Sequence, residues 1–294
     1  MAHEFLTLRK PKTVNFMQKR RCWLAICLAL VTTLVGAQQA RNDATYQPTL
    51  GQMGKDVMWL PTPKALVDNM LNMAQVTDQD LLYDLGAGDG VIAITAAQKH
   101  GARAVGIEYN PKLAAYAQQK VVEAGVQDKV RIIQGDIFQT DFSQATVLTL
   151  YLLPEINYQL RPTILKMKPG TRVVSHDFDM VEWEPDAITQ TPRSRALMWV
   201  VPADVAGEWT FQPGQGAPFE VRFAQIFQRI GGVRRWGGQE QALVGAQLQA
   251  DRLSFQYVAA DQSIHTVKAT VQGQRMQGQD MSLGQTVTIT AQRR

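Results

Sequence analysis

Two kinds of hydrophobic pattern follow one another along the chain. Between residues 57 and 203, short continuous apolar runs alternate with stretches in which apolar positions recur at helical spacing. The runs predict strands and the spaced stretches predict helices, and their alternation is typical of a parallel sheet with crossover helices. Strands are expected at residues 81–84, 104–108, 130–134, 146–151 and 171–176, and helices at residues 91–100, 111–124 and 154–167.

A helix is expected to open this region, and a hairpin is expected to close it. Thr62 and Pro63 look like an N-cap followed by proline at the first helical position, and apolar side chains then recur at helical spacing from Leu66. Residues 187–191 and 196–201 look like strands whose connection is too short for a crossover helix, so they should pair antiparallel at the sheet edge. Together these elements predict an α/β fold, a Rossmann-like seven-stranded, mostly parallel sheet with helices on both faces.

After Pro202 the pattern changes to a period of two. Glutamine becomes abundant, and short alternating strands separated by turns replace the helices. Strands are expected at residues 208–212, 219–228, 241–249, 253–258, 264–272 and 286–292, with turns at Gly231-Gly232, Gly237-Gly238, Asp251-Arg252 and Gly273. Residues 206–294 are therefore expected to form a small all-β C-terminal domain, either a meander or a small barrel.

Residues 1–37 look like an export signal, followed by a polar N-terminal arm at residues 38–56. A basic run that ends in Arg20-Arg21 precedes an apolar stretch over residues 23–35, and Ala37 offers a cleavage site. The apolar stretch is short for a membrane span, which needs roughly 20 residues. We therefore expect a periplasmic or secreted protein with no stable membrane span in its mature form, with a twin-arginine route as one possibility for export. The alternatives are an uncleaved anchor in the inner membrane and a buried helix.

The charge balance changes once this leader is set aside. The chain has 30 basic and 26 acidic residues, but residues 1–37 hold six of the basic residues and one acid, which leaves 24 against 25. Since no basic stripe interleaved with aromatic residues follows, no nucleic-acid partner is expected. Both cysteines, Cys22 and Cys27, lie in the leader, and no histidine has partners at a metal-ligand spacing. No metal is therefore expected.

The candidate chemistry lies in a glycine-rich turn between the first predicted strand and the helix after it. Asp84 ends the strand, and Gly86, Gly88 and Gly90 follow, which lets the backbone approach a ligand and adopt positive φ ahead of a helix N-terminus with free N–H groups. A dinucleotide turn of the pattern G-x-G-x-x-G that starts at Gly86 would need a glycine where Val91 stands.

Acidic side chains around this turn favour a cationic nucleoside. S-adenosylmethionine (SAM) has no phosphate and carries a sulfonium and an ammonium group, whereas NAD carries a pyrophosphate; Asp84 and Asp89 would attract the first and repel the second. Glu108, at the end of the second predicted strand, can accept both ribose hydroxyls. Asp136, after the third strand, can accept from the adenine amino group. The expected cofactor is therefore SAM (S-adenosyl-L-methionine). The weaker alternative is that the chain is a dehydrogenase that binds NAD.

These residues at this spacing resemble the class I SAM-dependent methyltransferases over about half of the chain. Three flanking segments are similar to a narrower group, which contains the ATP synthase c-subunit lysine methyltransferases and bacterial relatives. The segments are VMWLPTP at residues 57–63, LYLLP at 150–154 and SHDFD at 175–179. The resemblance implies a protein amine as the methyl acceptor. The motif YLLP at residues 151–154 replaces the Asn/Asp-Pro-Pro-Tyr signature of adenine-N6 and glutamine methyltransferases, which argues against those substrates.

Methyl transfer is an in-line displacement in which positioning and removal of water matter more than a strong base. Tyr151 is the first candidate for lining the methyl channel and Asp177 the second, since either could orient an acceptor amine. Structural alternatives exist for each selected residue. The glycines could form only a tight turn, Asp84 could cap the helix, Glu108, Asp136 and Asp177 could be loop or surface acids, and Tyr151 could be a packed aromatic residue.

The expected function is transfer of a methyl group from SAM to a protein or small-molecule acceptor. Export raises a difficulty, because SAM is made in the cytoplasm and its charges make it cross a bilayer poorly. The alternative function is an exported envelope module that binds SAM or a nucleoside with little or no turnover, in which the β domain recognises a partner. The sequence predicts neither the acceptor nor the oligomeric state.

Overall fold

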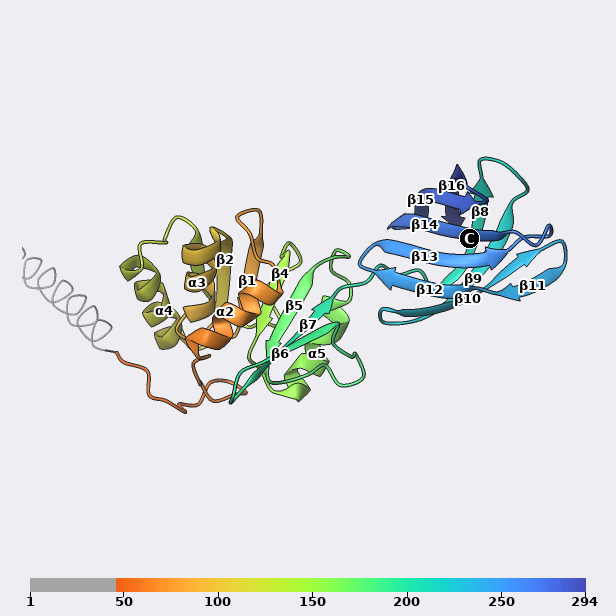
Figure 1. The fold of residues 1–294 in the computed structure, drawn as a ribbon. Coiled ribbons are helices and arrows are strands. Elements are labelled where there is room, and N and C mark those ends of the chain that lie inside the picture. The colour runs from red at the N-terminus through yellow and green to blue at the C-terminus, as the bar shows by residue number, and fades with distance from the viewer. Residues whose placement is uncertain (1–45) are drawn as a thin grey trace, which may run out of the picture. The chain divides into compact units, whose positions relative to one another are not determined.

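The computed structural model describes residues 46–294, which form two β-sheets (Figure 1). The predicted export signal at residues 1–37 and the first part of the predicted arm lie outside the described residues. The first sheet has seven strands and is flanked by helices, and the second has nine strands. The predicted fold class, an α/β domain followed by an all-β domain, is confirmed. Among the helices of residues 46–294, none has the length and apolar character that crossing a membrane requires.

The first sheet has the strand order β3-β2-β1-β4-β5-β7-β6. Its parallel strands are β1 (Leu81–Leu85), β2 (Arg103–Glu108), β3 (Val130–Gln134), β4 (Val147–Leu150) and β5 (Arg172–His176). β7 (Arg195–Val200) pairs antiparallel with both β5 and β6 (Ala187–Gln190). The predicted hairpin is therefore present, with β6 at the sheet edge. All seven predicted strands are confirmed to within one residue at each end.

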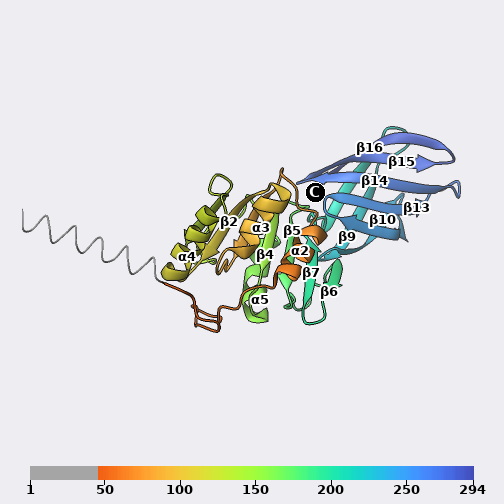
Figure 2. The same cartoon turned by 60° about the vertical axis from the view of Figure 1, so that its left-hand side comes forward.

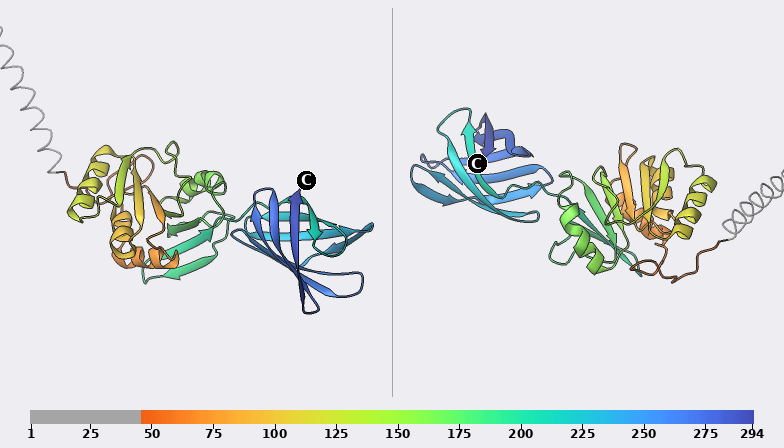
Figure 3. Two further views of the ribbon diagram at one scale, coloured as in Figure 1. Left: turned by 90° about the horizontal axis from the view of Figure 1, so that it is seen from above. Right: turned by 180° about the vertical axis from the view of Figure 1, so that it is seen from behind.

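Helices cover both faces of this sheet, as predicted (Figures 1 and 3). They are α2 (Lys64–Met73), α3 (Val91–His100) and α4 (Pro111–Glu123) on one face and α5 (Pro154–Ile164) on the other. Successive residues of a strand point to opposite faces, so Val147 packs with the first group of helices while Leu148 packs with α5. Two apolar cores thus hold the strands from either side and fix where the strands end.

The predicted N-cap of the first helix is wrong. α2 begins at Lys64 with Pro63 at the N-cap position, and no side chain caps it. The hydroxyl of Thr62 lies instead 3.1 Å from Nδ1 of His176, and both residues are buried. A hydroxyl taken out of water needs a partner, and here the end of β5 provides it in place of the helix.

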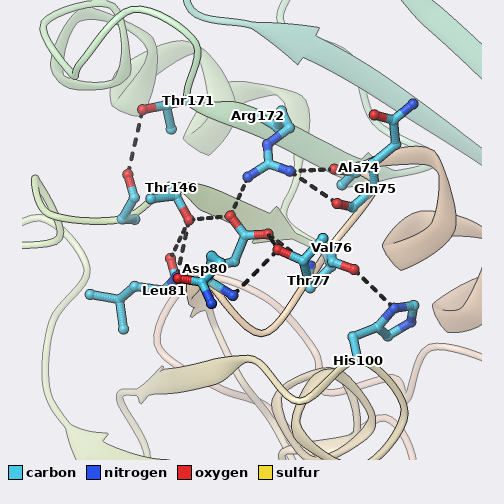
Figure 4. Close-up of polar contacts among 12 residues, drawn as sticks. Ala74, Gln75, Val76, Thr77, Asp80, Leu81, His100, Thr146, Thr171 and Arg172 are labelled. Carbon is cyan, nitrogen blue, oxygen red and sulfur yellow. Dashed lines mark hydrogen bonds and ion pairs between the residues drawn. The ribbon is translucent and has the colours of Figure 1, made fainter.

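A buried acid, Asp80, lies at the edge of the sheet where the parallel strands begin (Figure 4). It lies directly before β1, forms an ion pair with Arg172 of β5, and accepts hydrogen bonds from the hydroxyl of Thr146 at 2.7 Å and the backbone N–H of Thr77 at 2.8 Å. Arg172 also donates to the carbonyl of Ala74, just after α2, at 2.7 Å. Burial alone would raise the pKa of Asp80, but these hydrogen bonds and the guanidinium hold it below its ordinary value.

The second sheet is an antiparallel meander of nine strands in the order β11-β10-β9-β8-β16-β15-β14-β13-β12. The strands are β8 (Gly207–Pro213), β9 (Phe219–Ile226), β10 (Arg229–Trp236), β11 (Gln239–Ala242), β12 (Val244–Gln249), β13 (Arg252–Val258), β14 (Ile264–Gln272), β15 (Arg275–Ser282) and β16 (Gln285–Arg293). The last strand pairs with the first, and β10 also contacts β12, so the sheet curls toward a barrel (Figure 2). Large aromatic side chains, among them Trp209, Phe211 and Phe255, fill its interior.

Two strands of this sheet, β10 and β15, were not predicted. Gly231-Gly232, which we expected to be a turn, lies within β10 and pairs with β9. A Cβ at Gly232 would lie 2.8 Å from the side chain of Leu243, so the glycine permits close packing rather than a turn. Gly278 in β15 is similar, because a Cβ there would collide with the carbonyl of Lys268 in β14. The predicted strand at residues 241–249 is divided into β11 and β12.

Candidate active site

The carboxyl ends of the parallel strands surround a cleft with about 930 Å³ of empty space. Parallel strands place their carboxyl ends at one edge of a sheet, and ligands of such sheets bind there. Asp84 of β1, Glu108 of β2, Asp136 after β3 and Tyr151 after β4 all line the cleft.

The glycine turn forms the floor of this cleft. Gly86 and Gly88 both line it and have φ of 82° and 56°, which favour glycine. The N–H of Gly88 donates to Oε2 of Glu108 at 3.0 Å. A Cβ at Gly88 would lie 2.6 Å from the indole nitrogen of Trp59, and one at Gly86 would lie 3.0 Å from Leu152. The turn thus packs closely against Trp59 and Leu152, which leaves no room for a side chain at either glycine.

Gly90 and Asp89 occupy different sides of the same turn. Gly90 is the N-cap residue of α3 with φ of 79°, and a Cβ there would contact Ala117 and Ile132 at 3.5 and 3.6 Å, so it faces the helices behind the cleft. It is not among the residues that line the cleft, and its predicted contact with the cofactor stays a prediction. Asp89 does line the cleft, and its carboxylate accepts from the N–H of Val91 at 3.3 Å.

Two buried carboxylates, Asp84 and Glu108, and the half-buried carboxylate of Asp89 give the cleft its electrostatic character. Burial, reinforced by the charges of Asp89 and Glu108, raises the pKa of Asp84 to about 7, although the hydroxyl of Thr149 donates to it at 2.7 Å. Burial also raises the pKa of Asp89 and of Glu108. Within residues 46–294, no lysine or arginine forms an ion pair with any of the three. A bound cation would therefore relieve their desolvation.

A segment that we call the strap, residues 51–62, covers the cleft. Its ends are joined by hydrogen bonds from the N–H of Gly51 to the carbonyl of Trp59 at 3.0 Å and from the N–H of Trp59 to the carbonyl of Gln52 at 2.8 Å. Trp59 lies against Gly88, as described above. Gln52 and residues 54–56, which we predicted to belong to the polar arm, line the cleft together with the rest of the strap.

Asp136 lies in the cleft but is already engaged by the strap. Nζ of Lys55 donates to its carboxylate at 2.9 Å, and the N–H of Phe138 donates to it at 2.9 Å. The hydrogen bond from Lys55 is the main cause that holds the pKa of Asp136 below its usual range. Lys55 also lies 5.3 Å above the ring of Tyr109, another residue of the cleft. A ligand that reaches Asp136 would share it with Lys55, and its predicted role toward adenine stays a prediction.

An aromatic stack lies behind the part of the cleft that Tyr151 lines. The ring of Tyr151 stacks on His176 with a centroid distance of 3.7 Å and on Phe178 at 6.1 Å. Nδ1 of His176 lies 3.1 Å from the hydroxyl of Thr62, and Nε2 lies 3.4 Å from the carboxylate of Asp177. Burial lowers the pKa of His176, so its ring is neutral near pH 7. Burial, followed by the charge of Asp177, raises the pKa of Tyr151, so its hydroxyl keeps its proton.

Asp177 is one step removed from the cleft. It has φ of 61°, its carboxylate accepts from the N–H of Arg195 at 2.7 Å, and its own N–H donates to the carbonyl of Arg195 at 2.9 Å. Neither Asp177 nor His176 lines the cleft, so Asp177 can act there only through His176 and Tyr151, as a positioning residue. Its predicted catalytic role stays a prediction. His176, to which the sequence analysis assigns no role in a metal site, is the residue that connects Asp177 to Tyr151.

These features fit SAM. Gly86 and Gly88 bring backbone without side chains to the cleft, and Glu108 offers carboxylate oxygens beside them. The charges of Asp84 and Asp89, which have no lysine or arginine partner among residues 46–294, suit a sulfonium and an ammonium group. A pyrophosphate would add negative charge to a site in which burial already raises the pKa of three carboxyl groups. The geometry therefore favours SAM over a dinucleotide.

Similarity to known proteins agrees with this geometry. The family described as the ANTKMT methyltransferase domain matches residues 84–187. A protein-lysine N-methyltransferase of Saccharolobus islandicus is 42% identical over 134 residues, which are 45% of this chain and 83% of that protein. The ATP synthase c-subunit lysine N-methyltransferase of Mus musculus is 30% identical over 163 residues, 54% of this chain and 65% of that protein.

A solved structure is also similar. The RNA methyltransferase from Salinibacter ruber, in complex with S-adenosyl-L-homocysteine, is 51% identical, covers 50% of this chain and 96% of its own, and superposes with a TM-score of 0.49. The sequence relatives establish the enzyme class that the cleft suggested, with SAM as the cofactor. The chain belongs to the family of SAM-dependent methyltransferases that contains these protein-lysine N-methyltransferases.

Proposed function

We propose that this chain transfers the methyl group of SAM to the side-chain amine of lysine in a protein. The observation that carries the proposal is the juxtaposition of an acid-lined cofactor cleft with an aromatic wall, in which Tyr151 lines the cleft and His176 and Phe178 stack behind it. The two sequence relatives described above, both named as lysine N-methyltransferases, support the same acceptor.

The aromatic wall suits an alkylamine. An aromatic face attracts an ammonium group, which helps the charged lysine to bind. Apolar surroundings then lower the pKa of the bound lysine, which favours the neutral amine that can attack a methyl group. Bound SAM would supply that methyl group on a positively charged sulfur. Asp84, Asp89 and Glu108 would hold the cofactor in the cleft by their charge.

The proton of the lysine is not accepted by the wall itself. Both ring nitrogens of His176 are close to polar partners, Thr62 on one side and Asp177 on the other. With its pKa lowered by burial, His176 serves to orient the ring of Tyr151, and the proton leaves to water at the mouth of the cleft. Tyr151 thus binds the acceptor, while His176 and Asp177 position Tyr151.

Methyl-labelled SAM tests the acceptor class. The purified full-length chain is incubated with labelled SAM and cell extract, and the product is divided between protease and nuclease digestion. We expect label that protease releases and nuclease does not, on lysine by peptide mass spectrometry. Tyr151→Phe should retain most of the rate, whereas Tyr151→Leu should lower kcat about tenfold or more with SAM affinity unchanged. Glu123→Gln, on the exposed surface of α4, is the control.

Two outcomes would overturn this proposal. Label that nuclease releases would identify RNA as the acceptor. The second outcome combines two results: calorimetry shows SAM binding, but no methyl group is transferred in extracts of any compartment. It would favour a binding module with little turnover.

We also propose that the mature chain acts outside the inner membrane, as a periplasmic or secreted protein with an α/β domain at residues 57–203 and a β domain at residues 206–294. The support for export is the leader sequence alone, a basic run before the apolar residues 23–35 and Ala37. Fractionation of a tagged chain with mass measurement of the mature N-terminus tests it. An intact leader in the cytoplasmic fraction would contradict export.

A further inference from the structure

A second pocket lies at one end of the curled sheet of the β domain, distant in sequence from every residue of the cleft. The ends or beginnings of strands β8, β9, β10, β13, β14, β15 and β16 meet there and line an open pocket with about 880 Å³ of empty space. The open ends of β-barrels are common places for small ligands to bind. Polar side chains that line the pocket include Arg234, Tyr257, His265, Asp280 and Ser282.

Arg234 is buried in this pocket with most of its donors unused. Only 7% of the residue is exposed, and aromatic rings surround its guanidinium carbon, with centroids of Trp236, Tyr257 and Phe219 at 4.1, 4.2 and 4.7 Å. An arginine has five N–H donors. Within residues 46–294, the sole hydrogen bond from this side chain runs to the carbonyl of Val258 at 3.5 Å, which is long, and Nε has no partner.

The acid in the pocket does not pair with Arg234. One carboxylate oxygen of Asp280 accepts from the hydroxyl of Tyr257 at 2.7 Å, and the other lies 2.9 Å from Nδ1 of His265. The ring of His265 also stacks on Tyr257 at 4.7 Å. Asp280 thus has its own partners and forms no ion pair with the guanidinium. The hydroxyl of Ser282, which also lines the pocket, is buried without a partner among the described residues.

A comparison within the chain shows how unusual this arginine is. Arg172 in the first sheet has Asp80 and the carbonyls of Ala74 and Gln75 as partners. A buried guanidinium without such partners costs several kcal/mol in general, and three aromatic rings offset part of this cost through their faces. Rings cannot accept hydrogen bonds in the plane of the guanidinium, where the N–H groups point. That plane is where a planar oxyanion binds with two parallel hydrogen bonds.

We propose that this pocket binds a small organic molecule through a carboxylate or phosphate group, which Arg234 holds in the plane of its guanidinium while the apolar part of the molecule packs on the surrounding rings. Arginine is suited to this role because its rigid fork matches both oxyanions and its faces stack on aromatic side chains. The buried hydroxyl of Ser282 provides a further hydrogen bond to the same ligand. The site is independent of methyl transfer and gives the β domain a ligand of its own.

Simple aromatic anions test the site on the full-length protein. The probes are benzoate and phenyl phosphate, with benzamide as the neutral counterpart and benzylamine as the cation, each titrated by calorimetry. We expect one of the anions to bind, and the stronger of the two identifies the oxyanion. Arg234→Gln should weaken binding about tenfold or more. Arg235→Gln, on the same strand but paired with Glu240 at the surface, is the matched control and should bind as the wild type does.

A second measurement is needed in case Arg234→Gln fails to fold. The bound anion should change the fluorescence of Trp236, which is seen as a difference between the wild type and Trp236→Phe. The proposal is overturned if neither anion binds at millimolar concentration, if benzamide or benzylamine binds as well as the anions do, if folded Arg234→Gln retains wild-type affinity, or if an anion binds without affecting Trp236.

Discussion

The two ends of strand β1 carry buried acids in opposite circumstances. Asp80, before the strand, is 5% exposed, and Asp84, within it, is 3% exposed. Asp80 has a guanidinium, a hydroxyl and a backbone N–H as partners, and its pKa is lowered. Asp84 has a hydrogen bond from Thr149 and two acids nearby, and its pKa is raised to about 7. Both residues have a small exposed fraction, but desolvation is the largest cause of the raised pKa at Asp84, whereas hydrogen bonds and the guanidinium outweigh desolvation at Asp80.

The two acids distinguish the amino edge, which stabilises the sheet, from the carboxyl edge, which binds the cofactor. At the amino edge, the charge of Asp80 is compensated within the chain, which contributes to stability. At the carboxyl edge, the charge of Asp84 is left for a ligand, which costs stability in the free protein. A strongly perturbed acid in a cleft is typical of a functional site, whereas Asp80 shows that hydrogen bonds and a guanidinium can outweigh the desolvation of a carboxyl group.

Removing the acid at the amino edge should have the largest effect. Asp80→Ala leaves Arg172 and Thr146 without their shared acceptor, so we expect a loss of about 3–5 kcal/mol in the free energy of unfolding. Denaturant titration measures it, with the exposed neighbour Asp78→Ala as the control. The SAM affinity of the folded fraction should stay within a few-fold of the wild type. Lost affinity at full stability would reverse the roles that we assign to the two edges.

Removing the charge at the carboxyl edge should affect binding instead. Asp84→Asn keeps an oxygen that can accept from Thr149 but loses the charge that attracts the cofactor, so we expect SAM affinity to fall by about 10- to 100-fold, or about 1.5–3 kcal/mol. The free protein should be as stable as the wild type or more stable, because an uncompensated buried charge has been removed. Calorimetry with SAM and thermal unfolding without it measure the pair. A variant that binds normally but unfolds easily would contradict this assignment.

The pH dependence of the two ends should differ in sign. Asp84 has a pKa of about 7 in the folded chain and about 4 when unfolded. Between these values only the folded state holds the proton, so its contribution makes the free protein more stable as pH falls from 8 to 5. SAM affinity should fall over the same range, since the proton competes with the cation. Asp80, whose pKa is lowered on folding, instead contributes stability above pH 4 that is lost below it.

Difference measurements isolate these contributions. The slope of SAM affinity against pH should decrease in Asp84→Asn, and the loss of stability below pH 4 should decrease in Asp80→Ala. Equal slopes for a variant and the wild type would show that another acid, such as Glu108, dominates the titration.

The smallest effect is expected from the one internal partner of Asp84. Thr149→Val removes the hydroxyl that donates to the carboxylate with little change in volume. The pKa of Asp84 should rise further, so the midpoint of SAM affinity against pH should shift upward by about half a unit to one unit, or about 1 kcal/mol. Thr95→Val on α3 is a control of the same kind, since its hydroxyl bonds only within the helix. An unchanged midpoint would mean that Thr149 does not support the charged form.

The first sheet could be predicted because its signals are local. Each strand is a short apolar run, and Asp84, Glu108 and Asp136 stand at or just after strand ends, which parallel strands bring to one edge. The strap could not be predicted in this way, because Lys55 and Trp59 reach the cleft through contacts with residues far along the chain. His176 gave a weak signal for the same reason, since its partners Thr62 and Tyr151 come from other elements.

In the β domain, the prediction failed at one pair of glycines, because paired glycines occur both in turns and within strands. Gly237-Gly238 is a turn, as predicted, and both residues have positive φ. Gly231-Gly232 is also a pair of glycines but lies within β10, where a Cβ at Gly232 would lie 2.8 Å from Leu243 and 3.1 Å from Phe223. The distinction depends on Leu243 and Phe223 across the sheet, so the local sequence does not contain it.

The pairing of β16 with β8 sets the order of events during synthesis. One edge of β8 stays unpaired while the seven strands from β9 to β15 are synthesised. It can pair only when β16, residues 285–293, has emerged from the ribosome. An unpaired edge of this kind can associate with other chains. The α/β sheet is complete in sequence before β8 begins, so the nascent chain passes through a stage in which one domain is finished and the other is still open.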